Sequence, residues 1–243
     1  MKKDYLSASS LKAFSKSPNH YLMYVNKTAE TTPAMTFGSA LHCFVLEPQE
    51  WSKRYAVAPA VDRRTKAGKI AFAEFVAENP EQEIITPADY SVILRMEEAL
   101  KNNPQAYEMV NNATAKEQRC EMKLHGYDWL GYADGFSAVE NHVFDIKTTQ
   151  DSSPDSFMRT AYQMNYHEQA YLYCKMTGAT NFYWIAMEKN APYNVTVYRQ
   201  TEDARIKAGQ HVQQLTKKFI AWDGQPEGYS NQIIDINLPS WAK

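Results

Sequence analysis

The chain has 243 residues, of which 44% are hydrophobic and 22% are charged, and its formal net charge is −2 at pH 7. This length allows one substantial core, the composition is ordinary for a soluble globular protein, and no apolar run approaches the roughly 18 residues of a membrane-spanning helix. The small net charge neither indicates nor excludes nucleic acid, because a local basic groove can bind phosphates on a neutral protein.

The N-terminus and the cysteines bear on the compartment of the protein. The first residues, MKKDYLSASSLKAF, carry two lysines but lack the apolar stretch of a secretion signal. Cys43, Cys120 and Cys174 are widely spaced, odd in number and without a CxxC pair, which suits a reducing compartment better than a disulfide framework. We therefore expect a cytoplasmic protein that does not interact with a membrane.

The N-terminal part of the chain is predicted to be mainly helical. A serine near Ser7 caps the first helix, and Ser17 with Pro18 separates it from a short aromatic helix. Thr86 and Pro87 provide the N-cap and the first turn of a later helix. Apolar residues at helical spacing predict two helices between these, over TFGSALHCFVLEP and TKAGKIAFAEFVAEN.

The middle of the chain changes to strand-forming patterns. Three strands joined by two tight turns are predicted over AKEQRCEMKL, WLGYADGFSAV and HVFDIKTT. One long helix follows from an N-cap at Ser153 to Gly178, and then two strands and a helix capped by Thr201. The order predicts a single α/β domain with a central mixed sheet, divided into a mainly helical part over 1–112, a sheet-and-helix part over 113–200 and a C-terminal helix and tail over 201–243.

Asp134, Asp145 and Lys147 fall on the second and third of these predicted strands. Alternate residues of a strand point to the same face, so Asp145 and Lys147 share a face. A two-residue turn at Glu140 and Asn141 would place Asp134 opposite Lys147, and a four-residue turn would place it opposite Asp145. Either register gathers the three side chains on one face of the sheet.

Two neighbouring carboxylates raise the pKa of each other and need a compensating positive charge. Oxygen ligands of this kind suit Mg²⁺ or Mn²⁺, and an adjacent lysine can hold a water or stabilise negative charge in a transition state. A bare Asp-x-Lys on a strand is more often an exposed ion-pair cluster. The matching orientation of Asp134 favours a metal site.

An aspartate followed about ten residues later by (D/E)-x-K on a hairpin resembles the signature of the PD-(D/E)XK nuclease superfamily, although Ala133 replaces the usual proline. GSALHCFVLEP resembles the G-x-x-L-H helix of its RecB-like branch, and YHEQAYLY resembles the Q-x-x-x-Y helix of the same branch. The segments LSASSLKAFSKSPNHYLMY, DRRTKAGKIAFAEF and PEGYSNQIIDINLPSWA are similar to RecE-type (exodeoxyribonuclease VIII-like) phage and prophage exonucleases. The similarity runs from Leu6 to Trp241, and the order and spacing of the motifs are more specific than any single motif.

The resemblance implies a restriction-endonuclease-like core and assigns the chemistry to particular residues. His42, Asp134, Asp145 and the backbone carbonyl of Ile146 are expected to bind one or two Mg²⁺ ions, for which Mn²⁺ can substitute. Lys147 is expected to orient or activate the water that attacks the phosphate. His42 would have to be neutral to bind the metal.

Further site residues also follow from the resemblance. Gln169 and Tyr173 are expected to contact the water, Lys147 or the nucleic-acid backbone. Glu117 matches an acidic position before the hairpin and is a further candidate metal ligand. A basic loop is either DNA-facing or merely solvated, with no preference between the two; its residues are Arg63, Arg64, Lys66 and Lys69.

The function implied by the resemblance is Mg²⁺-dependent hydrolysis of linear double-stranded DNA. RecE-type enzymes degrade the duplex 5′→3′ from its ends, leave 3′ single strands for a RecT-like annealing protein, and form homo-oligomeric rings. Two alternatives remain: a related metal-dependent single-strand exonuclease or endonuclease, and a non-catalytic DNA-binding recombination module. The complete set of Asp134, Asp145, Lys147 and His42 argues against the non-catalytic module.

Overall fold

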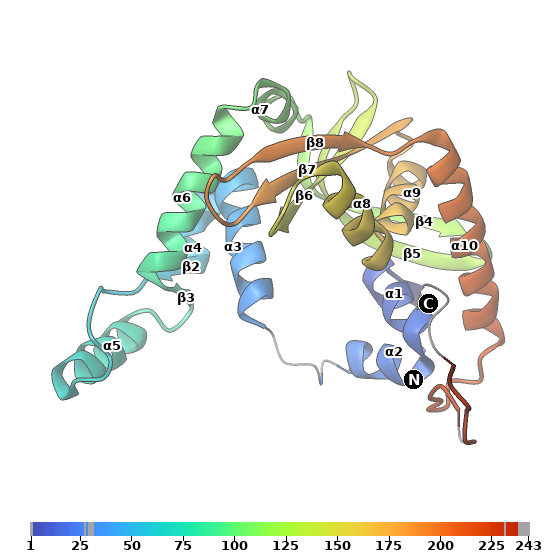
Figure 1. The fold of residues 1–243 in the computed structure, drawn as a ribbon, viewed down its shortest axis with the longest axis horizontal. Coiled ribbons are helices and arrows are strands. Elements are labelled where there is room, and N and C mark those ends of the chain that lie inside the picture. Colours follow the sequence, from blue (N-terminus) through green and yellow to red (C-terminus); the bar gives the residue numbers. More distant parts are fainter. Residues whose placement is uncertain (1, 27, 29–31, 231, 238–243) are drawn as a thin grey trace.

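The computed structural model describes residues 2–26, 28, 32–230 and 232–237. Its centre is a six-stranded mixed sheet in which the strand order is β1-β5-β6-β7-β8, with β4 paired to β5 (Figure 1). Strands β4, β5 and β6 form an antiparallel meander, β7 runs parallel to β6, and β8 is antiparallel to β7. The strands are β1 (Tyr5–Leu6), β4 (Ala115–Leu124), β5 (Tyr127–Ser137), β6 (His142–Thr149), β7 (Asn181–Glu188) and β8 (Val195–Arg199).

Helices cover both faces of this sheet. On one face, α3, α6 and α7 pack against Phe144 and Ile146 of β6. On the other face, α8 and α9 pack against Val143, which alternates with those residues along the strand. The helices are α1 (Ala8–Lys16), α2 (Pro18–Val25), α3 (Pro33–Leu46), α4 (Trp51–Arg54), α5 (Lys66–Glu78), α6 (Pro87–Lys101), α7 (Pro104–Asn111), α8 (Pro154–Gln163), α9 (Tyr166–Thr177) and α10 (Glu202–Ala221). The predicted α/β architecture with a central mixed sheet and flanking helices is confirmed.

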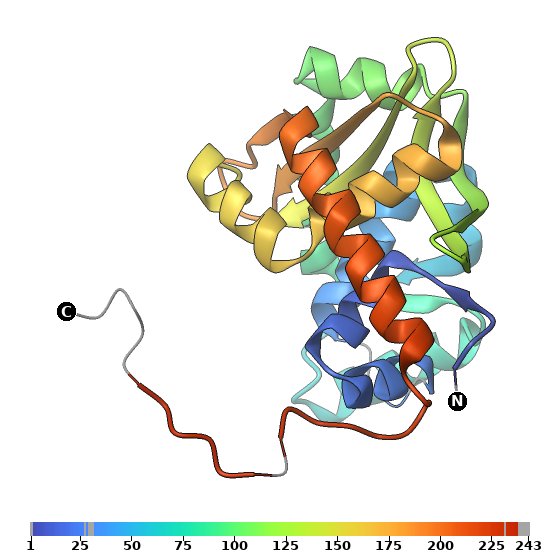
Figure 2. The same cartoon turned by 90° about the vertical axis from the view of Figure 1, so that its right-hand side faces the viewer.

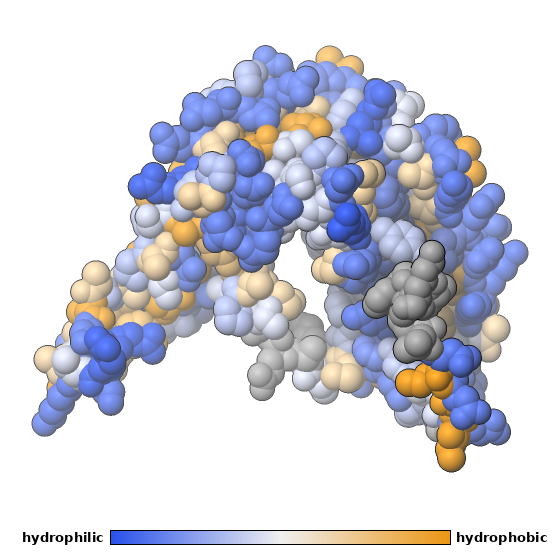
Figure 3. All heavy atoms as spheres, in the orientation of Figure 1, coloured by the Kyte–Doolittle hydropathy of each residue, from blue (hydrophilic) through white to orange (hydrophobic). Residues whose placement is uncertain are grey.

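The molecule has the outline of an arch. The main sheet spans its top; one leg contains α3, α5, α6 and the small parallel sheet of β2 (Tyr55–Val57) and β3 (Glu83–Ile85), and the other contains α1, α2 and α10 (Figure 1). The space-filling view shows an open hollow between the two legs (Figure 3). From the lower end of α10, residues 223–230 and 232–237 run away from the body as an extended tail (Figure 2). Within the described residues, no helix has the length and apolar character required to span a membrane.

The connection between β5 and β6 selects one of the two predicted registers. Ser137 pairs with His142, so four residues connect the strands, and this register places Asp134 opposite Asp145.

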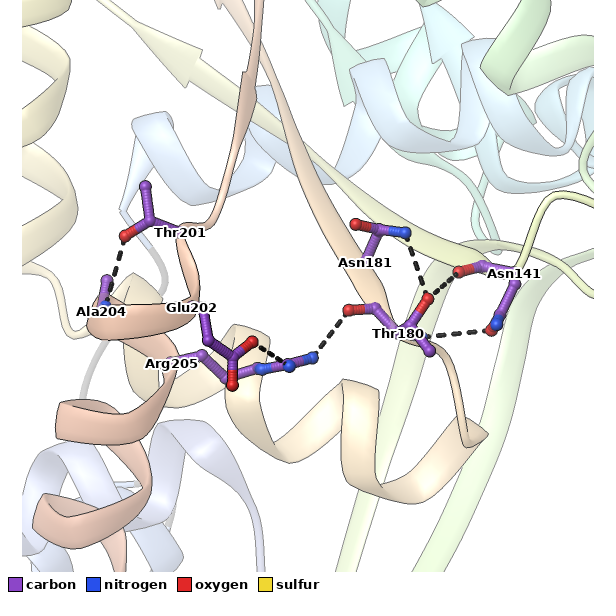
Figure 4. Close-up of polar contacts among 7 residues, drawn as sticks. All are labelled: Asn141, Thr180, Asn181, Thr201, Glu202, Ala204 and Arg205. Carbon is purple, nitrogen blue, oxygen red and sulfur yellow. Dashed lines mark hydrogen bonds and ion pairs between the residues drawn. The ribbon is translucent and has the colours of Figure 1, made fainter.

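A chain of polar contacts holds the loop between β5 and β6: the Thr180 amide donates to Asn141 Oδ1 at 3.1 Å, and Arg205 of α10 donates to the Thr180 carbonyl at 2.7 Å (Figure 4). The loop is therefore tied to the starts of β7 and α10.

The prediction of one continuous helix from Ser153 to Gly178 is wrong. The helix ends at Gln163 and a new one starts at Tyr166, because Asn165 takes the left-handed conformation with φ +55°. Asparagine tolerates this conformation better than most non-glycine residues. The break gives α9 its own start and leaves a corner in the chain at residues 164–165.

Gly135 and Gly38 offer a matched test of the packing around β6. A Cβ at Gly135 would lie 2.0 Å from the ring of buried Phe144, whereas a Cβ at Gly38 in α3 would meet nothing within 4 Å. We expect Gly135→Ala to lower the free energy of unfolding by about 1–3 kcal/mol through overpacking. Gly38→Ala should raise it by up to about 1 kcal/mol through helix propensity. Urea denaturation measures both, and equal effects would contradict this account of the β5–β6 contact.

Candidate active site

Asp134 is the side chain around which the site is arranged. It is buried, with 7% of its surface exposed, and its Oδ2 accepts a hydrogen bond of 2.7 Å from the backbone amide of Ile146. The backbone ladder between β5 and β6 ends at the pair Gly135 and Phe144. Beyond this pair, the Ile146 amide donates to the Asp134 carboxylate instead of to a backbone carbonyl of β5. The strands can therefore diverge next to Asp145 without leaving the Ile146 amide unpaired.

His42 reaches this point from α3. Its neighbours Leu41 and Cys43 are buried, and they fix the helix against the sheet. The imidazole Nδ1 lies 3.4 Å from Asp134 Oδ2, and Nε2 lies 3.0 Å from the Ile146 carbonyl oxygen. The structure therefore brings together three of the four predicted metal ligands in direct contact.

Glu117 completes a cluster with these residues. It lies on β4, where its neighbours Lys116 and Gln118 pair with Gly135 and Ala133 of β5. Glu117 is therefore opposite Asp134. Donor atoms of Glu117, His42 and Asp134 all lie within 4.8 Å of one another. One imidazole nitrogen and two carboxylates form a donor set that fits a divalent cation such as Mg²⁺ or Mn²⁺.

Asp145 and Lys147 form the second half of the site, together with Gln169. Gln169 Nε2 donates to Asp145 Oδ1 at 2.9 Å, and Lys147 Nζ donates to Gln169 Oε1 at 3.0 Å. Lys147 Nζ also lies 2.5 Å from Asp145 Oδ2 in an ion pair. The three side chains form a closed ring, so Gln169 of α9 fixes both the carboxylate and the ammonium.

Sequence reasoning gave no site role to Tyr166, which the structure places beside Lys147. Lys147 Nζ lies 4.5 Å from the centre of the Tyr166 ring, within the range of a cation–π interaction. Tyr166 is the first residue of α9 and follows directly on Asn165. Its orientation depends on the helix break, and no local pattern in the sequence indicated that break.

Burial and mutual repulsion raise the pKa of two of the acids. Burial raises the pKa of Asp145 to about 6, and the charge of Asp134 adds to this effect, although Lys147 opposes it. Burial likewise raises the pKa of Glu117 to about 7, again reinforced by Asp134. These carboxyls lie in a setting that a bound cation would stabilise in the charged form.

His42 and Lys147 carry the positive charge in this arrangement. Burial disfavours the charged form of His42, but Asp134 and Asp145 outweigh it and raise the imidazole pKa to about 9. Burial also opposes the charge on Lys147, yet Asp145 keeps the pKa of the ammonium above its usual value. The pKa of Asp134 is held low, because His42 and Lys147 overcome the effect of its burial. His42 is thus protonated at neutral pH and must lose a proton to bind a metal.

The remaining predicted residues are not all gathered at the cluster. Tyr173 of α9 is buried, its ring lies against Gly131 of β5, and burial together with the charge of Asp145 raises its pKa. Arg63 and Arg64 lie just before α5 and Lys66 and Lys69 lie in its first turns, at the end of the leg away from β6 (Figure 1). There Arg64 pairs with Asp62 at 3.0 Å and the Arg63 guanidinium stacks 3.9 Å from the ring centre of Phe72. The structure does not bring Arg63, Arg64, Lys66 or Lys69 to the carboxylates.

The fold and the carboxylate–lysine cluster define a PD-(D/E)XK-like domain. The family model described as "PDDEXK-like domain of unknown function (DUF3799)" matches residues 7–227, and the chain belongs to this family. No curated protein matches the sequence. The predicted superfamily and the restriction-endonuclease-like fold are therefore confirmed.

The chain is similar to a solved structure that shares its fold. The crystal structure of a "Putative exonuclease" from Eubacterium rectale is 16% identical, covers 89% of this chain and 80% of its own chain, and has a TM-score of 0.62. A "phage related exonuclease" from Haemophilus somnus 129PT is 13% identical, covers 75% of this chain and 93% of its own, and has a TM-score of 0.37.

Metal binding at this site should release protons. Because the metal-free pKa values are about 9 for His42, about 7 for Glu117 and about 6 for Asp145, protons compete with the cation below those values. We expect Mn²⁺ affinity to rise steadily from pH 6 to pH 9, with release of at least about one proton per site at pH 7. Calorimetry in two buffers of different ionisation enthalpy measures both quantities.

The control for this experiment is Glu117→Gln. Removal of one titrating ligand should weaken Mn²⁺ binding and reduce the number of protons released at pH 7. An affinity independent of pH over this range would show that the ion does not bind where these groups meet.

Proposed function

We propose that the chain is a divalent-cation-dependent DNA exonuclease of the RecE type. The observation that carries the proposal is the contact set of Asp134, Asp145, Lys147 and His42, because it joins a buried acidic pair to a fixed ammonium and an imidazole at one point. The likeness to the "Putative exonuclease" of Eubacterium rectale supports exonuclease rather than other nuclease activity. Mg²⁺ is the proposed physiological ion, with Mn²⁺ as its substitute.

The ion would be held by His42, Glu117, Asp134, Asp145 and the Ile146 carbonyl. When bound, it supplies a Lewis acid that lowers the pKa of a water and offsets the charge of the phosphate. The side chains that would hold the ion are buried or half-buried, and electrostatic interactions are stronger there because the local dielectric constant is lower than in water. Where β5 and β6 separate, the Ile146 carbonyl contacts the His42 imidazole and not a backbone amide of β5.

Lys147 is proposed to orient the attacking water and to stabilise the negative charge that develops on the phosphate oxygens. Its raised pKa keeps it charged, so it acts as a hydrogen-bond donor and not as the base that removes the proton. Gln169 is a positioning residue, since it holds Lys147 and Asp145 in one geometry. Tyr166 also contacts the ammonium through its ring, 4.5 Å from the ring centre.

The arch provides an approach to this site. His42 comes from the leg that contains α3, and the other leg begins with α1, so the site lies where the two legs meet the sheet (Figures 1 and 3). We propose that the end of a linear duplex enters the hollow and that one strand is degraded in the 5′→3′ direction. The remaining 3′ strand would then pass to a RecT-like annealing protein.

The first test compares DNA forms and active-site variants. We expect the purified protein with Mg²⁺ to release nucleotides from linear duplex but not from closed circular duplex, and to stop when the metal is chelated. Lys147→Ala and Asp145→Asn should lower turnover at least about 100-fold, as loss of a group that stabilises the transition state does. Lys123→Ala, which removes an exposed lysine of β4, should leave turnover unchanged.

The substrates also separate the alternatives. Cutting of the circular duplex would identify an endonuclease, and degradation of single strands alone would identify a single-strand exonuclease. Labels placed at the 5′ or 3′ end decide the polarity. DNA binding without metal-dependent release from any of these substrates would overturn the nuclease proposal in favour of a non-catalytic module.

We further propose that the chain forms a homo-oligomer. The extended tail carries Tyr229, Ile233 and Ile236 with exposed fractions of 78%, 98% and 91%, and large apolar side chains this exposed are typical of interaction sites. The α5 arm at the opposite side of the arch also exposes Ile70, which is 49% exposed (Figure 1). In a head-to-tail arrangement, the tail of one copy would pack against the α5 arm of the next, and such an interface can close into a ring.

Light scattering coupled to size exclusion tests this arrangement. The wild-type protein should have a mass several times the 27.9 kDa of one chain. Ile233→Ser with Ile236→Ser should shift the population toward the single chain, because the tail would lose its apolar anchors. Ile206→Ser, an exposed isoleucine on α10, serves as the control and should leave the mass unchanged. A wild-type mass of one chain would refute the oligomer.

A further inference from the structure

An exposed tyrosine lies on β5, two residues before Asp134. Tyr132 is 52% exposed, whereas its neighbours Gly131 and Ala133 are buried and packed against α9. Alternate residues of a strand point to the same face, so Tyr132 shares a face with Asp134 and lies about 7 Å from it along the strand. The ring is therefore beside the proposed metal site, on the face of the sheet away from α9.

Arg119 of β4 is the cross-strand neighbour of Tyr132. Side chains of directly paired residues on antiparallel strands start about 5 Å apart, so the guanidinium and the ring form one surface. The guanidinium forms an ion pair with Glu121, and both of these side chains are exposed. The surface is thus open to a ligand at its aromatic and at its charged part.

The same face continues outward from Tyr132 into a pocket at the edge of the sheet. The pocket has a volume of about 430 Å³, and its lining includes Arg119, Leu130 and Tyr5 of β1. Tyr5 is 40% exposed and pairs with Asp128 of β5. A volume in this range holds a group the size of a small organic ligand, so a chain molecule that crosses Tyr132 has room to continue.

The charges on this face do not suit the backbone of a duplex. Arg119 is paired with Glu121. Further along the two strands, Lys123 lies opposite Asp128. A surface that holds phosphates by charge needs an excess of basic residues, whereas an exposed aromatic ring holds an unpaired base by stacking, whichever base it is. An arginine beside the ring can stack on the same base. The face therefore fits the bases of a single strand.

We propose that Tyr132 is the stacking platform for an unpaired base of the DNA strand that is hydrolysed, at the nucleotide next to the phosphate held by the metal site. Arg119 contacts the same nucleotide from the neighbouring strand. The inference rests on the proposed nuclease function and deepens it, because it names the form in which the substrate reaches the metal. The end of a linear duplex must open before its base can stack, so hydrolysis acts on a single strand.

Binding of a single-stranded oligonucleotide without divalent cations, followed by fluorescence anisotropy, tests the stack. Tyr132→Ala removes the ring and Tyr132→Phe keeps it. Tyr107→Ala is the matched control, because Tyr107 is 41% exposed on α7 at the top of the arch (Figure 1). Tyr132→Ala should weaken binding about 5- to 10-fold, as loss of one base–aromatic stack does. Its salt dependence should stay that of the wild type, because no phosphate contact is lost. The other two variants should change binding less than about twofold.

Photocross-linking locates the stacked base. Oligonucleotides that carry 5-iododeoxyuridine at successive positions from one end are irradiated with the wild-type protein, and mass spectrometry identifies the residue that is attached. A cross-link to Tyr132 from one or two positions supports the platform. If the protein shows this cross-link but cleaves no DNA, the nuclease proposal fails while the stacking site stands. Absence of the cross-link from every position would overturn the platform.

The cleavage assay separates the stack from the nuclease activity. With linear duplex, Tyr132→Ala should raise KM at least about fivefold, and Tyr132→Phe should keep the wild-type value. An active enzyme in which Tyr132→Ala equals wild type would retain the nuclease proposal and refute the stack. A loss of binding confined to blunt duplex would assign the ring to the terminal base pair. A lower mass of Tyr132→Ala in light scattering would assign the face to contact between copies, and either result overturns the role in holding an unpaired base.

Discussion

The hydrogen bond from the Ile146 amide to the Asp134 carboxylate is the interaction on which the site depends. A regular hairpin would have continued the backbone ladder and closed the two strands over this point. Because a side chain takes the place of a carbonyl, the strands separate while the Ile146 amide stays paired. His42 and Asp145 then approach the same opening from different sides of the sheet.

Electrostatics explains why the surrounding groups come from distant parts of the chain. Three acids placed this close repel one another, and burial adds to the cost of each charge. Helix α3 brings an imidazolium to Asp134, and α9 brings an amide that holds Asp145 against Lys147. Each carboxylate of the β5–β6 pair therefore has a partner from a helix, His42 of α3 for Asp134 and Gln169 of α9 for Asp145.

The sequence was informative where the signal was local. Strand alternation and turn residues placed Asp134, Asp145 and Lys147 correctly, and the caps of most helices were recognisable from serine, threonine and proline. The corner at Asn165 was missed, because the apolar and aromatic pattern continues through it and only one backbone conformation breaks the helix. The exposure of Tyr132 could not be predicted from sequence, since strand alternation gives its face but not whether a helix covers that face.

The protonated His42 has a consequence for the life of the protein before it meets an ion. Its imidazolium bonds to both Asp134 and the Ile146 carbonyl, and so it occupies the place between two groups that are proposed to share a cation. Before a cation binds, the proton on His42 supplies the positive charge that holds Asp134 and the Ile146 carbonyl on either side of the imidazole. Binding of a cation would then exchange one positive charge for another between the same two oxygen atoms.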